Sequence, residues 1–363
     1  MKILHALRGL EATSGISTFV VELCNRQAEA GHQVCFVYQR SLEHSFSPKV
    51  LVLQESDIER LGWRPDIVHV HAIWSPFSVR ILRWCVKISI PFVVSPHGCL
   101  MPRVLQNGKI KKWIFLNLLL RPLLKKAKVW HCTGDGEVEA CRSLGFIGPF
   151  EIVPIGCDVP KLGGERKNTV LFLGRISEEK GLRLLLDAWG VLKPENWTLV
   201  IAGPDWFGER KRLEDKIVTE SIPNIRFVGV ADAALKDCLY REAKVFVLPS
   251  PMENFSAVVL DALAYSVPVI TTKGTPWRVI SERNCGWWIE QGVRPLVEAL
   301  GAALNMSDAE RESMGAKGRM LVEERYVWDG VVNEMLAIYE MAQTARVTKK
   351  KRNFNVEPEG VNQ

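Results

Sequence analysis

The segment from Val245 to Pro276 reads VFVLPSPMENFSAVVLDALAYSVPVITTKGTP. It begins with a short apolar run, Val245 to Leu248, of the kind that forms a buried strand. An apolar stretch with helical spacing follows, and after Pro268 a second strand-like run covers Val269 to Thr272. A strand, a helix and another strand in this order predict two parallel strands joined by a right-handed crossover.

The same alternation extends along the chain in two series. The first series contains predicted strands at Lys2–Leu7, Gln33–Tyr38, Ile67–His71, Phe92–Ser95, Val129–Cys132 and Glu151–Pro154. The second contains predicted strands at 169–173, 198–202, 225–228, 245–248, 269–272 and 287–289. Residues 161–168 between them are polar and rich in glycine, as an interdomain linker is. We therefore expect an α/β fold with two Rossmann-like domains facing each other across a cleft.

The predicted N-terminal domain covers residues 1–163 and the predicted C-terminal domain covers residues 168–325. Ser307-Asp-Ala-Glu310 has the spacing of a capping box and predicts the start of a helix. A last helix is expected over residues 326–345. Residues 346–363 are polar, contain KKKR and lack periodicity, so we expect a disordered tail there.

Length and composition are those of an ordinary globular protein, with 363 residues of which 47% are hydrophobic. The nine cysteines occur singly and form no CxxC pair, so reduced thiols are expected and a zinc site is not. The N-terminus predicts no signal peptide, and no run approaches the roughly 20 apolar residues of a membrane-spanning helix. We expect a cytoplasmic protein.

The net charge of +6 is a local feature of one segment. Residues 97–134 contain no Asp or Glu and eight basic residues, namely Arg103, Lys109, Lys111, Lys112, Arg121, Lys125, Lys126 and Lys128. Removing these eight charges would change +6 to −2. The sequence therefore does not predict general binding to nucleic acid.

Within this segment, residues 109–128 combine lysines with bulky apolar side chains around Trp113. Such a pattern is typical of an interfacial helix attracted to anionic lipid. A core helix with a basic rim explains the leucines equally well. The absence of acids favours the membrane alternative, with residues 103–128 contacting an anionic surface, peripherally at the inner face of the plasma membrane.

The opening segment carries two acids, Glu253 on the strand-to-helix turn and Asp261 two turns along the helix. Carboxylates accept hydrogen bonds from hydroxyl groups, and a helix N-terminus donates to oxygens and favours negative charge. This arrangement suits a ligand that is both polyhydroxylated and phosphorylated.

A second candidate loop, GRISEEKG, covers Gly174 to Gly181 and follows another predicted strand. In a doubly wound sheet, ligands bind at the carboxyl ends of the strands. Arg175 and Lys180 would there neutralise a diphosphate. A solvated charged loop is the alternative, and the acid-bearing loop at the same sheet edge favours the binding function.

Two weaker candidates lie in the first half. Gly15, in the turn Thr13-Ser14-Gly15-Ile16, would let backbone N–H groups approach a phosphate, although a plain turn explains it equally well. His97, in SPHG at a strand end, would bond a sugar hydroxyl or stabilise charge; a structural histidine is the alternative.

In the second half of the chain, Asp205 and Gly229 also follow predicted strands. They either frame a nucleotide base or form turns.

Taken together, these motifs resemble glycosyltransferase family 4, whose members are retaining enzymes of the GT-B fold. The stretch from Glu253 to Asp261 resembles the family's Glu-x7-Glu element, and GRISEEKG and SPHG resemble its other landmarks. The resemblance covers about residues 1 to 340. The stretches Thr275-Pro-Trp277 and Cys285-Gly-Trp-Trp288 resemble a bacterial subgroup used in lipopolysaccharide and exopolysaccharide assembly.

The resemblance implies a role for each candidate residue. Arg175 and Lys180 would hold the donor diphosphate together with Gly15, Glu253 would contact the donor sugar, His97 would lie near the transferred sugar, and Asp261 would bind the ribose. The N–H groups at Asn254, Phe255 and Ser256 would orient sugar and phosphate. The helix over 326–345 would pack back on the N-terminal domain.

The implied function is retaining transfer of a sugar from a nucleotide-sugar to a saccharide or lipid-linked acceptor, in bacterial cell-surface polysaccharide biosynthesis. A sugar-nucleotide epimerase of the same fold and a non-catalytic nucleotide-sugar-binding protein are the alternatives. The sequence has no DxD triad, so no metal cofactor is expected. Two positions depart from the family: Asp261 replaces Glu and is shorter by about 1.5 Å, and Ser256 stands where Gly is common.

Overall fold

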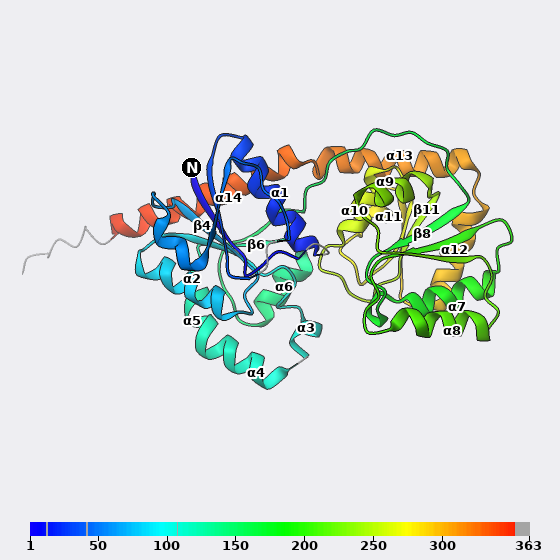
Figure 1. Ribbon diagram of the computed structural model, residues 1–363, viewed down its shortest axis with the longest axis horizontal. Helices are drawn as coiled ribbons and strands as arrows, with labels where there is room; N and C mark the ends of the chain where they lie inside the picture. Colours follow the sequence, from blue (N-terminus) through cyan, green and yellow to red (C-terminus); the bar gives the residue numbers. More distant parts are fainter. Residues whose placement is uncertain (12–13, 41–42, 107, 353–363) are drawn as a thin grey trace, which may run out of the picture. The chain divides into compact units, whose positions relative to one another are not determined.

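The computed structural model describes residues 1–11, 14–40, 43–106 and 108–352, with side chains described up to residue 344. The chain divides into two compact units (Figure 1). Unit 1 comprises Met1–Pro154 and Trp328–Gln363, and unit 2 comprises Ile155–Val327. Each unit contains one parallel sheet with helices around it.

The sheet of unit 1 has seven parallel strands in the order β3-β2-β1-β4-β5-β6-β7. Their bounds are β1 Lys2–Ala6, β2 Gln33–Tyr38, β3 Val50–Gln54, β4 Ile67–His71, β5 Phe92–Ser95, β6 Val129–Cys132 and β7 Phe150–Ile152. Every residue of β4, β5 and β6 is buried, so both faces of the sheet are covered there. Buried parallel strands are normally continuous apolar runs, yet β4 reads IVHVH.

The helices of unit 1 are mostly short. They are α1 Gly15–Glu29, η1 Glu55–Arg60, α2 Pro76–Lys87, α3 Pro102–Gln106, α4 Lys109–Ile114, η2 Phe115–Leu120, α5 Arg121–Leu124, α6 Asp135–Ser143 and α14 Trp328–Arg352. The long α14 comes from the far end of the sequence and contacts α1 together with β4, β5 and β6. It therefore closes one face of the unit 1 sheet.

The sheet of unit 2 has six parallel strands in the order β10-β9-β8-β11-β12-β13. Their bounds are β8 Thr169–Leu173, β9 Thr198–Ala202, β10 Ile225–Gly229, β11 Val245–Leu248, β12 Val269–Thr272 and β13 Gly286–Ile289. The strand order reverses between β8 and β11, which places the topological switch point of this sheet between those two strands.

The helices of unit 2 alternate with its strands. They are η3 Glu178–Lys180, α7 Leu182–Leu192, α8 Glu209–Thr219, α9 Ala233–Glu242, α10 Ala257–Ala264, α11 Val279–Glu282, α12 Val293–Asn305 and α13 Asp308–Arg325. Ser307 and Glu310 form both hydrogen bonds of the capping box that begins α13, as the sequence predicts. Trp189 of α7 and Phe246 of β11 are among the largest fully buried side chains of this unit.

The predicted strands are confirmed to within two residues at their ends, but β3 was missed. It lies at the edge of the sheet, and its Leu51 is 41% exposed, so no continuous apolar run marks it. The predicted linker is not a free connection either. The boundary between the units falls at Pro154, and the Arg166 guanidinium donates to the carbonyls of Ala243 and Tyr265 inside unit 2.

The predicted disordered tail begins too early. The helix α14 continues to Arg352, past Arg346, because lysine and arginine favour helix and no proline occurs between Trp328 and Pro358. Residues 353–363 of the predicted tail lie outside the described residues. No helix in the described part of the chain is long and apolar enough to cross a membrane.

Candidate active site

The two candidate loops of unit 2 meet at the switch point. Residues 174–181 follow β8 and residues 249–256 follow β11, and these two strands are neighbours. Lys180 Nζ lies 2.5 Å from Glu253 Oε1, and the two side chains are only 18% and 14% exposed. A partly buried cation and an anion therefore face each other at the position where doubly wound folds bind ligands.

Glycines let the backbones at this edge approach closely. Gly181 has a left-handed φ of +71°, and a Cβ on it would lie 2.3 Å from the carbonyl oxygen of Pro249. A Cβ on Gly274, after β12, would lie 1.9 Å from the carbonyl oxygen of Pro251. Since only glycine fits such contacts, the loops after β8, β11 and β12 are held against one another.

Arg175 does not join the Lys180–Glu253 pair. Its guanidinium lies 5.0 Å from the centre of the Trp206 ring, in a cation–π contact with the loop that follows β9. The main chain supports this contact, because the N–H of Ile176 donates to the carbonyl of Pro204 at 2.8 Å. The side chain of Arg175 remains exposed, beside the switch point. Asp205 accepts from the N–H of Arg210, so that carboxylate has a structural role at the start of α8.

The turn after Glu253 is held in an unusual conformation. Ser256 has a left-handed φ of +72°, which is strained for a non-glycine residue. Phe255 is buried against Trp277, and the indole N–H of Trp277 donates to the carbonyl of Phe255 at 2.5 Å. In the described part of the chain, the N–H groups of Phe255, Ser256 and Ala257 make no hydrogen bond. These N–H groups, at the start of α10, are suited to bind an anion.

Three buried hydroxyl groups lie on the same loops. Within the described residues, the Oγ atoms of Ser177, Ser250 and Ser256 have no hydrogen-bond partner. Ser177 belongs to the loop after β8, and the other two belong to the loop after β11. Buried polar atoms are nearly always hydrogen-bonded in folded proteins. Their grouping at one sheet edge is consistent with a site for a polar ligand.

Asp261 lies on α10, eight residues after Glu253, and is half-buried. Its carboxylate accepts no hydrogen bond from any residue that the structure describes. Burial raises the pKa of Asp261 from 3.8 to about 6, although the charge of Lys236 opposes this shift. A carboxylate with a raised pKa beside a candidate loop is typical of a functional group.

Two predicted site residues lie in unit 1. His97 has a left-handed φ of +51° after β5 and is 9% exposed. The next residue is fixed, because the N–H of Gly98 donates to Glu137 Oε1 at 2.5 Å. Gly15 begins α1, and a Cβ on it would meet no atom within 4 Å. Packing therefore does not demand a glycine there; Thr13, its neighbour in the motif, lies outside the described residues.

The His97 side chain belongs to a cluster that sequence reasoning missed. His5, His69, His71 and His131 lie with it in the interior of unit 1, and all are buried. Of the described side chains, His5, His69 and His71 form the one group that could hold a metal ion, with ligand atoms within 4.8 Å of one another. The signal was the strand register, because His5 of β1 lies directly beside His69 of β4.

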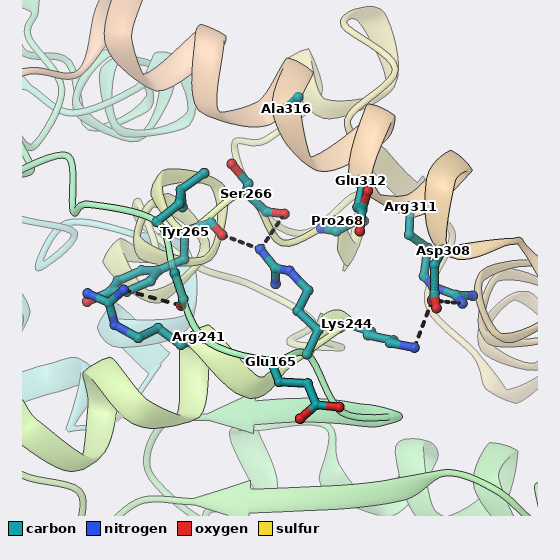
Figure 2. A pocket seen from close by; sticks show the side chains of 14 residues that line it. Glu165, Arg241, Lys244, Tyr265, Ser266, Pro268, Asp308, Arg311, Glu312 and Ala316 are labelled. Atoms are coloured by element: carbon teal, nitrogen blue, oxygen red, sulfur yellow. Dashed lines mark hydrogen bonds and ion pairs between the residues drawn. The ribbon is translucent and has the colours of Figure 1, made fainter.

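A different pocket, of about 590 Å³, lies at the opposite edge of the unit 2 sheet. Arg166, Lys244 and Pro268, which line it, each precede a strand. Figure 2 shows Asp308 between Lys244 and Arg311, with contacts of 2.7 and 2.6 Å. Because Asp308 holds both cations in ion pairs at the amino ends of the strands, we assign the pocket a structural role.

Comparison with known proteins identifies the family of the chain. The family model of the glycosyl transferases group 1 matches residues 159–320, and the glycosyl transferase 4-like domain matches residues 40–157. The chain belongs to glycosyltransferase family 4. This family 4 member thus has its group 1 domain on the unit that carries Lys180, Glu253 and Asp261.

The individual relatives of this family 4 member are distant. An uncharacterised glycosyltransferase of Methanocaldococcus jannaschii is 31% identical over 48% of this chain and 45% of its own length. A capsular polysaccharide biosynthesis glycosyltransferase of Staphylococcus aureus is 26% identical over 46% and 44%. The chain thus spans about half the length of the curated relatives it matches. The Anabaena protein HepE, solved with UDP and glucose, shares the fold with a TM-score of 0.74 at 14% identity, covering 95% of this chain and all of HepE.

Proposed function

We propose that this protein is a retaining glycosyltransferase of bacterial cell-surface polysaccharide biosynthesis. It moves a sugar from a nucleotide-sugar donor to a saccharide or lipid-linked acceptor. The observation that carries the proposal is the Lys180–Glu253 contact at the switch point, with Asp261 on the helix that follows. The Staphylococcus aureus relative acts in capsular polysaccharide biosynthesis, and HepE was solved with UDP and glucose, which supports a donor of this class.

In this proposal the donor occupies the carboxyl edge of the unit 2 sheet. Lys180 and Arg175 neutralise the diphosphate, and the N–H groups of residues 255–257 donate to its oxygens. Glu253 accepts hydrogen bonds from the hydroxyls of the donor sugar, and Asp261 accepts them from the ribose. Gly15 and His97 in unit 1 keep the roles that the resemblance implies.

The reaction then needs charge stabilisation at the leaving group. The bond between the anomeric carbon and the phosphate oxygen breaks, and the electron pair stays on the diphosphate, beside Lys180 and Arg175. The acceptor hydroxyl attacks the anomeric carbon from the same face, so the configuration is retained. The leaving phosphate oxygen takes the proton of that hydroxyl. Cationic side chains supply the charge that a divalent metal would otherwise provide.

The test is a turnover assay with a panel of UDP- and GDP-sugars, with and without a lipid-linked saccharide. Nucleotide release that depends on the acceptor supports a transferase, and the anomeric configuration of the product, read by NMR, tests retention. Release of free UDP without an acceptor would instead indicate the epimerase alternative, which the glycosyltransferase names of the relatives do not favour. Binding without release would indicate a non-catalytic protein.

A second proposal concerns the basic segment 103–128, which we propose contacts an anionic membrane surface. Leu116, Leu120 and Leu124 of the segment are buried, whereas Ile110, Trp113 and Leu118 are 77%, 65% and 67% exposed. Large apolar side chains facing solvent are unusual, and here they alternate with Lys109, Lys111 and Lys112. A π-helical turn, η2, precedes Pro122, so the segment changes helix type there instead of ending.

Co-sedimentation with vesicles tests this second proposal. We expect binding to vesicles containing phosphatidylglycerol and little binding to pure phosphatidylcholine, because each base near the surface contributes about 1 kcal/mol. The double variant Ile110→Ser, Trp113→Ser should lose binding. Ile147→Ser is a matched control in the same unit, since Ile147 is 93% exposed and lies outside the segment. Equal binding to both lipids, or equal loss in the control, would contradict the proposal.

A further inference from the structure

Five of the seven histidines of the chain gather in the interior of unit 1. His5 comes from β1, His69 and His71 from β4, His97 from the residues after β5, and His131 from β6. His69 and His71 are two residues apart on one strand, so their side chains lie on the same face of the sheet. Gln27 of α1, Ser95 of β5 and Tyr339 of α14 lie between the rings and hydrogen-bond to them.

These side chains form one continuous line of hydrogen bonds. It runs from His97 through His71, His5, Gln27, Tyr339, His69, Ser95 and His131 to the carbonyl of Val153, with successive distances of 3.0, 2.9, 2.8, 3.4, 2.8, 2.6, 2.6 and 2.9 Å. We call this line the histidine chain. Each of its internal side chains has a neighbour on both sides.

The donor and acceptor of each hydrogen bond in the histidine chain follow from the end at the carbonyl of Val153. A backbone carbonyl only accepts, so His131 carries its proton on Nε2 and donates to Val153. A neutral His131 then has a lone pair on Nδ1, which requires the Ser95 hydroxyl to donate to it. The Ser95 hydroxyl has one proton, and this proton is donated to His131. In the contact between Ser95 Oγ and His69 Nε2, the proton must therefore come from His69, which donates to Ser95.

The same reasoning passes through Tyr339. A neutral His69 with its proton on Nε2 has a lone pair on Nδ1, so the Tyr339 hydroxyl donates to it. Tyr339 is then free only to accept, and Gln27 Nε2 donates to it. This fixes the orientation of the Gln27 amide, because its carbonyl oxygen must face His5 and accept from His5 Nε2.

The remaining links lead outward. His5 Nδ1 accepts from His71 Nε2, and His71 Nδ1 accepts from His97 Nε2. All five imidazoles thus carry the proton on Nε2. Nine of their ten nitrogens have a partner, and the tenth, His97 Nδ1, has none among the described residues. The histidine chain therefore ends in one unprotonated nitrogen.

We propose that the histidine chain holds His97 with an unprotonated Nδ1 that accepts a hydrogen bond from a hydroxyl group of the ligand, with Tyr339 and Gln27 as positioning residues. The identity of that hydroxyl as one of the donor sugar rests on the proposed function. A lone pair repels a phosphate oxygen, which carries no proton to donate at neutral pH. His97 is thereby assigned to the sugar and not to the diphosphate.

The electrostatics agree with five neutral rings. Burial lowers the pKa of His5 and His131 to about 4 and that of His97 to about 3, and it lowers the pKa values of His69 and His71 well below the ordinary value. Cys24 of α1 and Tyr339 of α14 are buried titratable groups on the helices beside the rings, and burial raises both pKa values, so both are neutral. Glu137 approaches from α6, but it accepts from the N–H of Gly98.

A metal ion at His5, His69 and His71 is the competing assignment. It would displace hydrogen bonds that already satisfy both nitrogens of each ring, and it would bury a divalent charge with no carboxylate among the ligands. Burying an unpaired charge is strongly unfavourable. The hydrogen-bond assignment leaves no nitrogen of these three rings unsatisfied.

Tyr339 prevents the histidine chain from reversing. If the Gln27 amide rotated by a half-turn, its NH2 group would donate to His5, and the protons of His5, His71 and His97 would all move to Nδ1. The rotated carbonyl would then face a Tyr339 hydroxyl whose proton is already donated to His69. Tyr339→Phe removes that restriction while keeping the ring.

The test begins with the ligand-free full chain labelled with 15N-histidine. Long-range 1H–15N correlation spectra distinguish the two tautomers and the cation. We expect five histidines with Nε2–H and an unprotonated Nδ1 at neutral pH. Tyr339→Phe should add Nδ1–H signals at His5, His71 and His97, whereas Tyr38→Phe, whose hydroxyl makes no hydrogen bond within the described residues, should leave the spectrum unchanged. A His97 that is charged, or carries its proton on Nδ1, would overturn the proposal.

Binding then connects the tautomer to the ligand. The probes are the nucleotide-sugar found in the turnover assay and its free nucleoside diphosphate. His97→Ala should weaken nucleotide-sugar binding about tenfold and leave nucleoside diphosphate binding unchanged. In Tyr339→Phe, only the molecules whose His97 keeps its proton on Nε2 should bind the nucleotide-sugar normally. The Kd for the nucleotide-sugar should therefore equal the original Kd divided by the fraction of such molecules.

A single Nε2–H tautomer of His97 in Tyr339→Phe, or equal weakening of both probes, would overturn the positioning role. Failure of the proposed function is distinguishable from failure of this inference. A chain that turns over no nucleotide-sugar but shows the five expected tautomers would contradict the proposed function and uphold the histidine chain. Titration of His5, His69 and His71 by added Zn²⁺, seen as broadening or shifting of their signals, would overturn the assignment in favour of the metal site.

Discussion

Lys180 and Glu253 join the loops after β8 and β11 across the switch point of the unit 2 sheet, with 2.5 Å between Nζ and Oε1. Without a ligand, each neutralises the other. A bound diphosphate would compete with Glu253 for the lysine, and a sugar hydroxyl would then satisfy the carboxylate. The ion pair thus holds both groups in place before the donor arrives.

Replacing Lys180 by alanine should remove far more activity than stability. Loss of the group that stabilises the leaving diphosphate should lower kcat by about 100-fold or more. The free energy of unfolding should fall by about 1–3 kcal/mol, because Glu253, whose side chain is 14% exposed, loses its partner, and the protein should stay folded. Turnover and urea denaturation measure the two effects. Lys211→Ala, which removes an exposed ion pair with Asp215, is the control. Equal effects on activity and stability would favour the alternative that residues 174–181 form a solvated charged loop.

Arg175→Ala should behave like Lys180→Ala.

Donor binding should depend on pH through Asp261. Its pKa of about 6 in the ligand-free protein means that the carboxyl is largely protonated at pH 5 and ionised at pH 7. Because ribose hydroxyls donate to the ionised form, affinity for the nucleoside diphosphate should rise about tenfold from pH 5 to pH 7 and then level off. Isothermal titration measures this. In Asp261→Asn, the rise in affinity that is due to Asp261 should be absent. If the affinity of this variant changed with pH as in the original protein, the assignment of Asp261 to the ribose would be contradicted.

Stability should change with pH in the opposite direction. The pKa of Asp261 is higher in the folded than in the unfolded chain, so its contribution to stability is present below pH 4 and is lost as pH rises through 6. Asp261→Asn should remove that loss in urea titrations. Asp261→Glu should keep or improve donor affinity if this helix position binds the ribose, and a severe loss would indicate a different role.

Gly181→Ala should destabilise unit 2 more than Gly208→Ala. Both glycines have a left-handed φ, +71° and +72°. The backbone strain that alanine introduces should therefore be the same at both positions, about 1 kcal/mol. A Cβ at 181 would also lie 2.3 Å from the carbonyl of Pro249, while one at 208 would meet nothing within 4 Å. We expect an additional loss of about 1–3 kcal/mol for Gly181→Ala in urea denaturation. Equal losses would mean that the two loops do not need this close contact.

Turnover should not require a divalent metal. The sequence contains no DxD triad, and Arg175 and Lys180 supply positive charge to the diphosphate in our proposal. Excess EDTA should therefore leave nucleotide release unchanged. Activity that is lost with EDTA and restored by Mg²⁺ would contradict this expectation.

The sequence predicted the fold well where burial is complete. Strands such as Val245–Leu248 are apolar throughout because both faces of a parallel sheet are covered, and their runs are easily found. The edge strand Val50–Gln54 has no such run, and it was missed. The reach of α14 to Arg352 was missed because the KKKR stretch has the composition of a tail but also favours helix.

The site was predicted only at the level of loops. The strand-to-helix positions of Lys180 and Glu253 placed them at one sheet edge, but a direct contact between residues 73 positions apart depends on the strand order. The stacking of Arg175 on Trp206 and the strained φ of Ser256 depend equally on tertiary structure. The histidines of β4 interrupt an apolar run and look individually like core residues. Only the register of β1 beside β4 makes them a cluster.

The central claim is that Lys180 holds the donor diphosphate and Glu253 holds the donor sugar. Titration of Lys180→Met and Glu253→Gln with a nucleotide-sugar and with its free nucleoside diphosphate tests it most directly. Lys180→Met should weaken both ligands. Glu253→Gln should weaken the nucleotide-sugar but bind the nucleoside diphosphate as tightly as the original protein or more tightly, because Lys180 no longer has a competing partner. A Lys180→Met variant that binds both ligands normally would contradict the account.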